Sequence, residues 1–223
     1  LSNEPISKII NKKNFWKDEF FVNDFVLDPR PETEGIVEES IKLIKNKHCS
    51  IRILDIGTGT GIISLMLAQR SSAITIDGVE IDTSAYMQTV DNFENSDWSD
   101  RLYCYNTSFQ KFVDDTNKET YDLIVSNPPY VRALEKVEMS KNVLAYEPEL
   151  ALFVTDKDPL IFYKKISELA FDFLSQDGLL FFEINEYLGE ETTALIKNIG
   201  FKKIVLKQDM YLKNRMIMAK AIA

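Results

Sequence analysis

From residue 50 onwards, short apolar strands alternate with helix-like segments along the chain. Strands are expected at residues 51–56, 74–81, about 101–105, 121–126 and 179–184, the last one after a break at Gly178. Helices are expected just after Gly61, near 83–95, around 162–173 and near 188–199. This alternation predicts an α/β fold with a doubly wound, mostly parallel sheet and helices on both faces. Two final strands in direct succession, about 202–207 and 215–222, predict an antiparallel hairpin at the end.

The first 48 residues lack this alternation and are expected to form an N-terminal extension. Residues 19–27 read as two short strands around a turn at Asn23-Asp24. The run Pro29-Arg30-Pro31-Glu32-Thr33-Glu34 then opens a helix, because its acids fall in the first turn, where the helix dipole favours them. We therefore expect an extension at 1–48, made of a short hairpin and a helix, and a main domain at 49–223.

Composition narrows the classes of function. Apolar residues make up 45% of the 223 residues and charged residues 27%, as in a globular protein, and no apolar run approaches the ~20 residues of a membrane span. One histidine, His48, and two isolated cysteines, Cys49 and Cys104, give no multi-histidine zinc site, so no metal is expected. Free thiols fit a reducing, cytoplasmic compartment. The net charge of −9 argues against a tight generic nucleic-acid binder, although a local basic groove stays open.

A glycine-rich turn follows the first strand of the alternation. Asp55-Ile56-Gly57-Thr58-Gly59-Thr60-Gly61 stands where doubly wound folds bind ligands. The dinucleotide fingerprint would need glycine at position 62, which is isoleucine, whereas this spacing with a preceding acid is typical of S-adenosylmethionine-dependent methyltransferases. Glu80 ends the next strand, where a carboxylate can accept both ribose hydroxyls. Either feature alone could be an ordinary turn or strand-end acid; together they favour a cofactor site.

The tetrapeptide Asn127-Pro128-Pro129-Tyr130 directly follows the strand 121–126. It could be only a rigid turn that ends a strand. Methylation of a planar –NH₂ group would give the tetrapeptide a chemical role. The nitrogen of such a group is a weak nucleophile, so it has to be positioned and polarised. The Asn127 side-chain oxygen and the Pro128 carbonyl would accept its two N–H bonds, and Tyr130 would stack on the planar group. Such catalysis is positioning combined with preorganised electrostatics.

These motifs resemble the class I methyltransferases that modify planar amino nitrogens, and in particular the HemK-type release-factor glutamine (N5) methyltransferases. Further family markers are Glu4-Pro5-Ile6, Phe15-Trp16, Pro29–Glu34, Tyr146–Leu152 and Asn214-Arg215-Met216-Ile217. The resemblance implies methyl transfer from S-adenosylmethionine to the glutamine amide in the Gly-Gly-Gln loop of peptide chain release factors. The family usually carries a small helical domain ahead of the Glu4 region, so residues 1–48 are expected to be the remnant of a linker to it.

The resemblance also assigns residues. For the cofactor these are Asp55, Gly57, Thr58, Gly59, Gly61, Glu80, Phe109 and Asn127. Catalysis falls to Asn127, Pro128 and Tyr130, and substrate binding to the same three with Pro129. Phe109 stands where relatives have a bulky apolar residue near the adenine, and it could equally belong to the core. The segment 131–150 is long for a connection, and such segments often carry recognition.

Two other functions remain open from the sequence. An adenine-N6 or cytosine-N4 methyltransferase acting on RNA or DNA would use the same Asn-Pro-Pro-Tyr chemistry on a flipped base. A silent binding module would keep only the cofactor fold, but the intact Glu80 and Asn127 argue against it. The expected partner is therefore a release factor, with no membrane and no nucleic acid as direct substrate.

Overall fold

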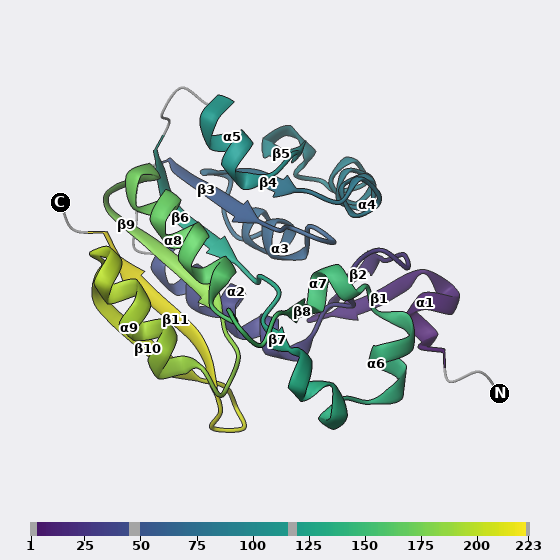
Figure 1. Ribbon diagram of the computed structural model, residues 1–223. Coiled ribbons are helices and arrows are strands. Elements are labelled where there is room, and N and C mark those ends of the chain that lie inside the picture. The colour runs from purple at the N-terminus through teal and green to yellow at the C-terminus, as the bar shows by residue number, and fades with distance from the viewer. Residues whose placement is uncertain (1–3, 45–49, 116–119, 222–223) are drawn as a thin grey trace.

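The computed structural model describes residues 4–44, 50–115 and 120–221 (Figure 1). Its centre is a seven-stranded sheet in the order β10-β11-β9-β6-β3-β4-β5. The strands are β3 (Ile51–Ile56), β4 (Ile74–Glu80), β5 (Leu102–Asn106), β6 (Tyr121–Ser126), β9 (Leu174–Glu183), β10 (Lys202–Gln208) and β11 (Asn214–Lys220). Neighbours from β5 to β9 pair in parallel, while β11 runs antiparallel to both β9 and β10. The predicted doubly wound sheet and its closing hairpin are confirmed.

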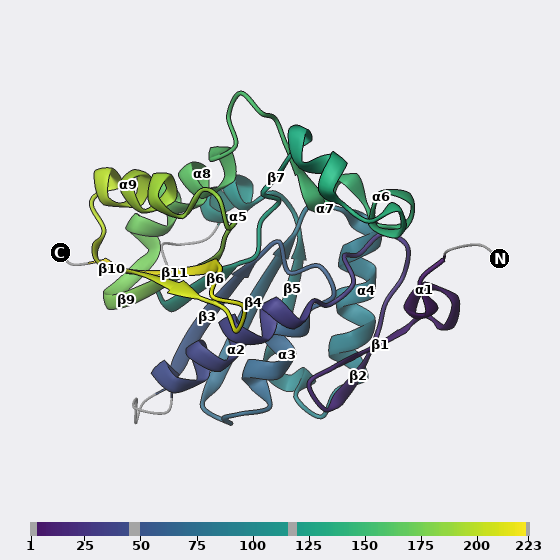
Figure 2. The same ribbon diagram turned by 90° about the horizontal axis from the view of Figure 1, so that it is seen from below.

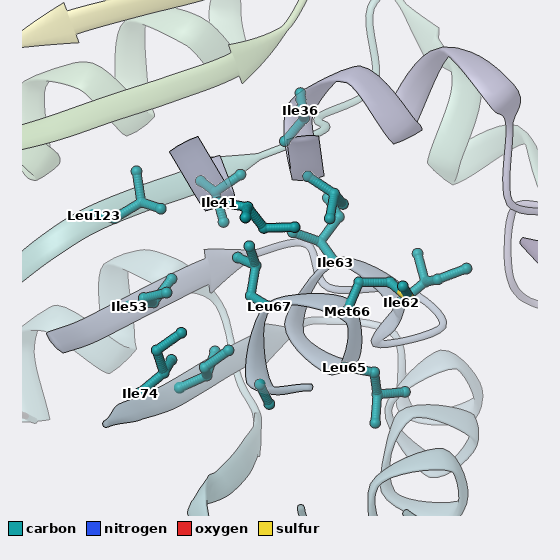
Figure 3. Packing of buried hydrophobic residues seen from close by; sticks show 14 of the residues in the cluster. Ile36, Ile41, Ile53, Ile62, Ile63, Leu65, Met66, Leu67, Ile74 and Leu123 are labelled. Atoms are coloured by element: carbon teal, nitrogen blue, oxygen red, sulfur yellow. The ribbon is translucent and has the colours of Figure 1, made fainter. Parts of the chain in front are cut away.

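Helices cover both faces of this sheet (Figure 2). On one face lie α2 (Pro31–Ile44), α3 (Ile62–Ala68) and α4 (Thr83–Glu94). On the other lie α5 (Phe109–Asp115), α8 (Ile161–Phe173) and α9 (Gly189–Ile199). Two apolar cores result, one beneath each layer. In the first, side chains of α2 and α3 interlock above β3 and β4 (Figure 3).

The strand order reverses between β3 and β6, and this reversal places the site. Chain connections run from β3 to β4 and β5 in one direction, and from β6 to β9 in the other. At such a switch point the loops after the two central strands part and leave a crevice at the carboxyl ends. The glycine turn follows β3 and the Asn-Pro-Pro-Tyr motif follows β6, so both motifs meet at this crevice.

The N-terminal extension contains a hairpin, but not where the sequence predicted it. It consists of β1 (Lys12–Phe15) and β2 (Asp18–Phe21), preceded by α1 (Ile6–Ile10). The expected turn at Asn23-Asp24 connects no strands, which corrects that prediction. The buried Lys8 ammonium bonds the carbonyls of Asn23 and Val26, each at 2.7 Å, and so occupies acceptors that a strand would use for pairing.

Strand β9 also differs from its prediction. It begins at Leu174, directly after α8, and passes through Gly178 instead of starting after it. Its pairing with β6 changes register between Tyr121 and Leu123, and Asp177 has a left-handed φ of 71°. Gly178 therefore lies in an irregular part of the strand. Only glycine fits there without a close contact, because a Cβ atom would come within 2.9 Å of the Ser175 carbonyl.

The segment after the Asn-Pro-Pro-Tyr motif is folded. Its elements are β7 (Val131–Arg132), the 3₁₀ helix η2 (Ala133–Glu138), α6 (Lys141–Tyr146), α7 (Glu149–Leu152) and β8 (Phe153–Val154). Strands β7 and β8 pair in parallel, so the residues between them leave the main fold and return at one point. We call residues 133–152 the insertion.

A second 3₁₀ helix, η1 (Ser99–Arg101), precedes β5.

Within residues 4–44, 50–115 and 120–221, no helix has the length and apolar character that a bilayer crossing demands. The same residues contain no group of three potential metal ligands. Cys104 is a free, half-buried thiol, as its sequence context indicated. His48 and Cys49 lie outside the described residues.

Candidate active site

The turn after β3 requires three glycines. Gly57, Gly59 and Gly61 have φ values of 71°, 59° and 76°, a left-handed region that strongly favours glycine. Among the described residues, a Cβ atom on Gly57 would meet no atom within 4 Å, and one on Gly59 only the Gly57 carbonyl at 4.0 Å. A Cβ atom on Gly61 would instead approach Phe93 of α4 to 2.6 Å. The first two glycines therefore border open space, and the third permits close packing.

Asp55 ends β3 and is almost fully buried. Its Oδ2 accepts hydrogen bonds from the hydroxyls of Thr58, at 2.8 Å, and Ser64, at 2.7 Å. Its Oδ1 is buried and accepts no bond from the part of the chain that the structure describes. Burial raises the pKa of Asp55 to about 6, against the two hydroxyl donors. Among the described residues, this oxygen beneath the glycine turn thus has no hydrogen-bond donor. A buried acceptor without a donor is unfavourable, so this position favours a partner that donates a hydrogen bond.

Glu80 lies at the end of β4, next to the glycine turn. Its Oε2 accepts a bond from the Gly59 backbone N–H and its Oε1 one from the Asp82 backbone N–H, each at 3.0 Å. Burial raises the pKa of Glu80, and the backbone donors act in the opposite direction. The carboxylate is therefore fixed at the edge of the crevice by two backbone groups.

Helix α4 holds the glycine turn through two polar side chains that the sequence reasoning missed. The Thr89 hydroxyl lies 2.6 Å from the Gly59 carbonyl, and the Asn92 amide donates to the Thr60 carbonyl at 2.8 Å. Asn92 also exchanges two hydrogen bonds with the backbone of Phe21 in β2. Thr89 and Asn92 both fall on the buried face of a predicted helix. Buried polar groups are almost always hydrogen-bonded, so their position could have indicated that they hold a neighbouring segment.

Asn127 follows β6, and the nitrogen of its side-chain amide faces the start of α2. Nδ2 lies 3.4 Å from the Thr33 hydroxyl oxygen, near the N-terminus of α2. No described residue donates a hydrogen bond to Asn127 Oδ1. The side-chain oxygen is therefore available as an acceptor.

Tyr130 is held at both ends. Its hydroxyl donates to Glu183 Oε1 at 2.9 Å, and its carbonyl accepts from the Asn185 amide at 3.0 Å. Glu183 Oε2 also accepts from the Thr33 hydroxyl at 2.8 Å. Burial raises the pKa of Glu183, while its hydroxyl donors and Arg215 oppose that rise; the pKa of Tyr130 is raised well above its usual value by burial.

A cavity of about 230 Å³ opens beside this cluster. Much of its apolar wall comes from the insertion, and its charged side chains come from the extension, from Glu183 at the end of β9 and from Arg215 near the start of β11. It is lined by Leu27, Arg30, Glu32, Asn127, Pro128, Tyr130, Val131, Met139, Ser140, Val143, Ala151, Leu152, Glu183 and Arg215. The structure therefore brings Asn127, Pro128 and Tyr130 to one cavity, and their catalytic roles stay a prediction.

The other predicted residues do not line this cavity: they are Asp55, Gly57, Thr58, Gly59, Gly61 and Glu80 around the glycine turn, and Pro129 and Phe109. Pro129 is half-buried and is not among the lining residues. Phe109 begins α5 and packs, partly buried, against the core between the sheet and α8. The core interpretation of Phe109 is thus observed, and contact with an adenine stays a prediction. Thr33, Glu183 and Asn185 bond the motif residues Asn127 and Tyr130, and the sequence motifs did not reveal them.

The chain is similar in sequence to known methyltransferases. The family model described as Methyltransferase small domain matches residues 41–150. A release factor glutamine methyltransferase of Flavobacterium psychrophilum is 44% identical over 218 residues, which are 96% of this chain and 74% of that protein. A tRNA1(Val) (adenine(37)-N6)-methyltransferase of Christiangramia forsetii is 60% identical over only 85 residues, 38% of this chain and 35% of that protein.

A solved structure gives the same fold. The protein-(glutamine-N5) methyltransferase (release factor-specific) of Alicyclobacillus acidocaldarius superposes with a TM-score of 0.53, covering 87% of this chain and 94% of that one, at 21% identity. This likeness supports the class I methyltransferase fold, and the sequence relationship carries the family. With 44% identity across nearly the whole of its length, the chain belongs to the release factor glutamine methyltransferase family.

Proposed function

We propose that the protein transfers a methyl group from S-adenosylmethionine to the side-chain amide nitrogen of the Gly-Gly-Gln glutamine in peptide chain release factors. The observation that carries this proposal is the Asn127 amide, whose nitrogen faces Thr33 while its oxygen stays available beside the cavity. A glutamine amide presents two N–H donors and so requires acceptors. The family relationship supports the choice of a release factor.

The glycine turn, Asp55 and Glu80 would hold the cofactor. Open space beside Gly57 and Gly59 fits a bound group, and the donorless Asp55 Oδ1 fits a ligand that brings a donor or a positive charge. Glu80 would accept the ribose hydroxyls. Thr58 and Gly61 shape the turn, and Phe109 would reach the adenine with the face that the core leaves uncovered. When bound, S-adenosylmethionine supplies a methyl group activated by a sulfonium.

Asn127 Oδ1 and the Pro128 carbonyl would accept the two N–H bonds of the substrate amide. This pairing fixes the direction of the nitrogen lone pair and draws electron density toward that nitrogen. Tyr130 would lie against the planar amide group, with its hydroxyl anchored on Glu183. Pro129 would keep the Pro128 backbone extended. The chain thus works by orientation and fixed dipoles. It needs no strong base, because the nitrogen's proton becomes acidic as the methyl group arrives and can leave to solvent.

A nucleic-acid substrate is the second candidate, because of the local 60% identity to a tRNA adenine methyltransferase. The net charge of −9 opposes it, since affinity for nucleic acids rests largely on neutralised phosphates. Side-by-side reactions of the protein with labelled cofactor and either a folded release factor or tRNA distinguish the two. We expect label in the release factor.

The free thiol of Cys104 fits a reducing, cytoplasmic compartment.

Replacing Glu80 by alanine tests the cofactor assignment. Charge-assisted hydrogen bonds contribute roughly 1.5–3 kcal/mol each, so the affinity for S-adenosylmethionine should fall at least about tenfold in calorimetry. Glu94→Ala is the matched control, because it removes the same charge from an exposed position at the end of α4. Thermal unfolding verifies that both variants are folded. Unchanged cofactor affinity in folded Glu80→Ala would contradict the assignment.

A further inference from the structure

The Glu183 carboxylate connects two residues that lie far apart in the sequence. It is 1% exposed, ends β9, and accepts one hydrogen bond on each oxygen, from Thr33 at 2.8 Å and from Tyr130 at 2.9 Å. An ionised carboxylate can only accept hydrogen bonds. When Glu183 is ionised, each of these hydroxyls therefore directs its single proton toward it.

This arrangement decides what Thr33 can offer to Asn127. A hydroxyl has one proton and two lone pairs. Because the Thr33 proton is directed to Glu183, the Thr33 oxygen can only accept from Asn127, which lies 3.4 Å away through Nδ2. The amide of Asn127 thus has its N–H₂ group toward Thr33 and its oxygen on the opposite side.

We propose that Thr33 and Glu183 are positioning residues that fix which end of the Asn127 amide faces the substrate. An asparagine amide can turn by about 180° about its last torsion at little intrinsic cost, because that torsion is broad and roughly two-fold. The turned amide would present N–H₂ to the N–H₂ group of the incoming glutamine, two donors face to face. This inference rests on the proposed function, since it concerns the orientation of the acceptor used there.

The same carboxylate also fixes the other end of the motif. Glu183 holds the Tyr130 hydroxyl, and Asn185, two residues later, holds the Tyr130 carbonyl at 3.0 Å. The Asn185 amide also donates to the carboxylate of the buried Glu135 at 2.8 Å. The carboxyl end of β9 therefore aligns Asn127, through Thr33, and Tyr130 directly, although Glu183 need not touch the substrate.

The test compares two substitutions at one position. Thr33→Val keeps the shape but removes the hydroxyl, and Thr33→Ser keeps the hydroxyl. Thr33→Val should lower kcat about tenfold, while KM for the release factor and cofactor affinity change less than about twofold. Thr33→Ser should restore kcat. Thr192→Val in α9 is the control, because it removes another buried threonine hydroxyl, one that bonds the Leu188 carbonyl at 2.7 Å.

A spectroscopic measurement separates this proposal from the proposed function. The side-chain N–H₂ signals of Asn127, assigned by their absence in Asn127→Ala, should shift in Thr33→Val and in Glu183→Gln but not in Thr192→Val. This holds whether or not the protein methylates a release factor. Failure of the parent protein to methylate that substrate would reject the proposed function alone. Unmoved Asn127 signals in Thr33→Val, or a Thr33→Ser variant as slow as Thr33→Val, would overturn the positioning role.

Discussion

Asn127→Ala is expected to lower kcat for release-factor methylation by about 10²–10³-fold, by analogy with the loss of one fixed hydrogen-bond donor at an oxyanion. The variant keeps the Pro128 carbonyl but loses the side-chain acceptor, so one N–H bond of the substrate amide has no partner. The nitrogen is then neither aligned nor polarised. Asn127 lines the same cavity as residues of the insertion, so the loss is expected on the substrate side of the site.

The affinity for S-adenosylmethionine should barely change in Asn127→Ala, because the glycine turn, Asp55 and Glu80 are intact. Single-turnover kinetics with labelled cofactor measure the rate, and calorimetry measures the affinity. Asn198→Ala is the control, since this asparagine is exposed on α9 and lies outside the cavity. Methylation by Asn127→Ala at close to the parent rate would show that the proposed mechanism is wrong.

Lys8→Met should lower the free energy of unfolding by about 3–5 kcal/mol, the range found when one partner of a buried ion pair is removed. The Lys8 side chain is fully buried, and its ammonium lies 3.4 Å from the carboxylate of Asp28 and 3.8 Å from that of Glu147. Glu147 also accepts the Asp28 backbone N–H at 3.0 Å and the Arg30 guanidinium at 3.3 Å. Without Lys8, these two buried carboxylates keep, among the described residues, only partly exposed cations as partners, Lys13 at 3.5 Å from Asp28 and Arg30 on Glu147.

This cluster joins the N-terminal extension to the insertion that forms one wall of the cavity, so its loss should loosen the site as well as the fold. Urea unfolding of Lys8→Met measures the effect. Lys12→Met removes an exposed partner of Glu19, a pair at 2.6 Å, and should cost about 1 kcal/mol or less. Equal stability losses in the two lysine variants would contradict the structural role of Lys8.

Local patterns were sufficient to predict the framework of the site. Asp55 and the glycine turn could be read because a strand followed by a tight turn and a helix is specified within a few residues. Glu80 and Asn127 could be located because each directly follows an apolar run. In a parallel sheet the carboxyl ends of neighbouring strands lie at one edge, so these residues meet once the topology is known.

The supporting side chains could not be predicted, because their partners lie far away in the sequence. Thr33 and Glu183 are 150 positions apart, and Asn127 and Thr33 are 94 apart. Thr33 reads as an ordinary residue of a helix N-terminus, and Glu183 as the end of an apolar strand. Their hydrogen bonds depend on how α2 packs against the ends of β6 and β9, which no periodicity encodes.

The misplaced N-terminal hairpin has a similar cause. The run 19–27 reads as two short apolar strands around a turn, but Lys8 bonds two carbonyls of its second half, and this tertiary contact overrides the local pattern. The earlier hairpin turns at Trp16, which has a left-handed φ of 56° and lies under the Arg70 guanidinium at 5.2 Å. That contact also comes from a distant part of the chain.

Mapping the methylated residue tests the central claim most directly. The protein is incubated with labelled S-adenosylmethionine and a folded release factor, and the product is digested and sequenced by mass spectrometry. We expect the methyl group on the side-chain amide of the Gly-Gly-Gln glutamine, no signal when that glutamine is changed to asparagine, and poor reaction of a free Gly-Gly-Gln peptide, because remote contacts contribute to orientation. Strong methylation of tRNA or DNA, with none of the release factor, would contradict the account.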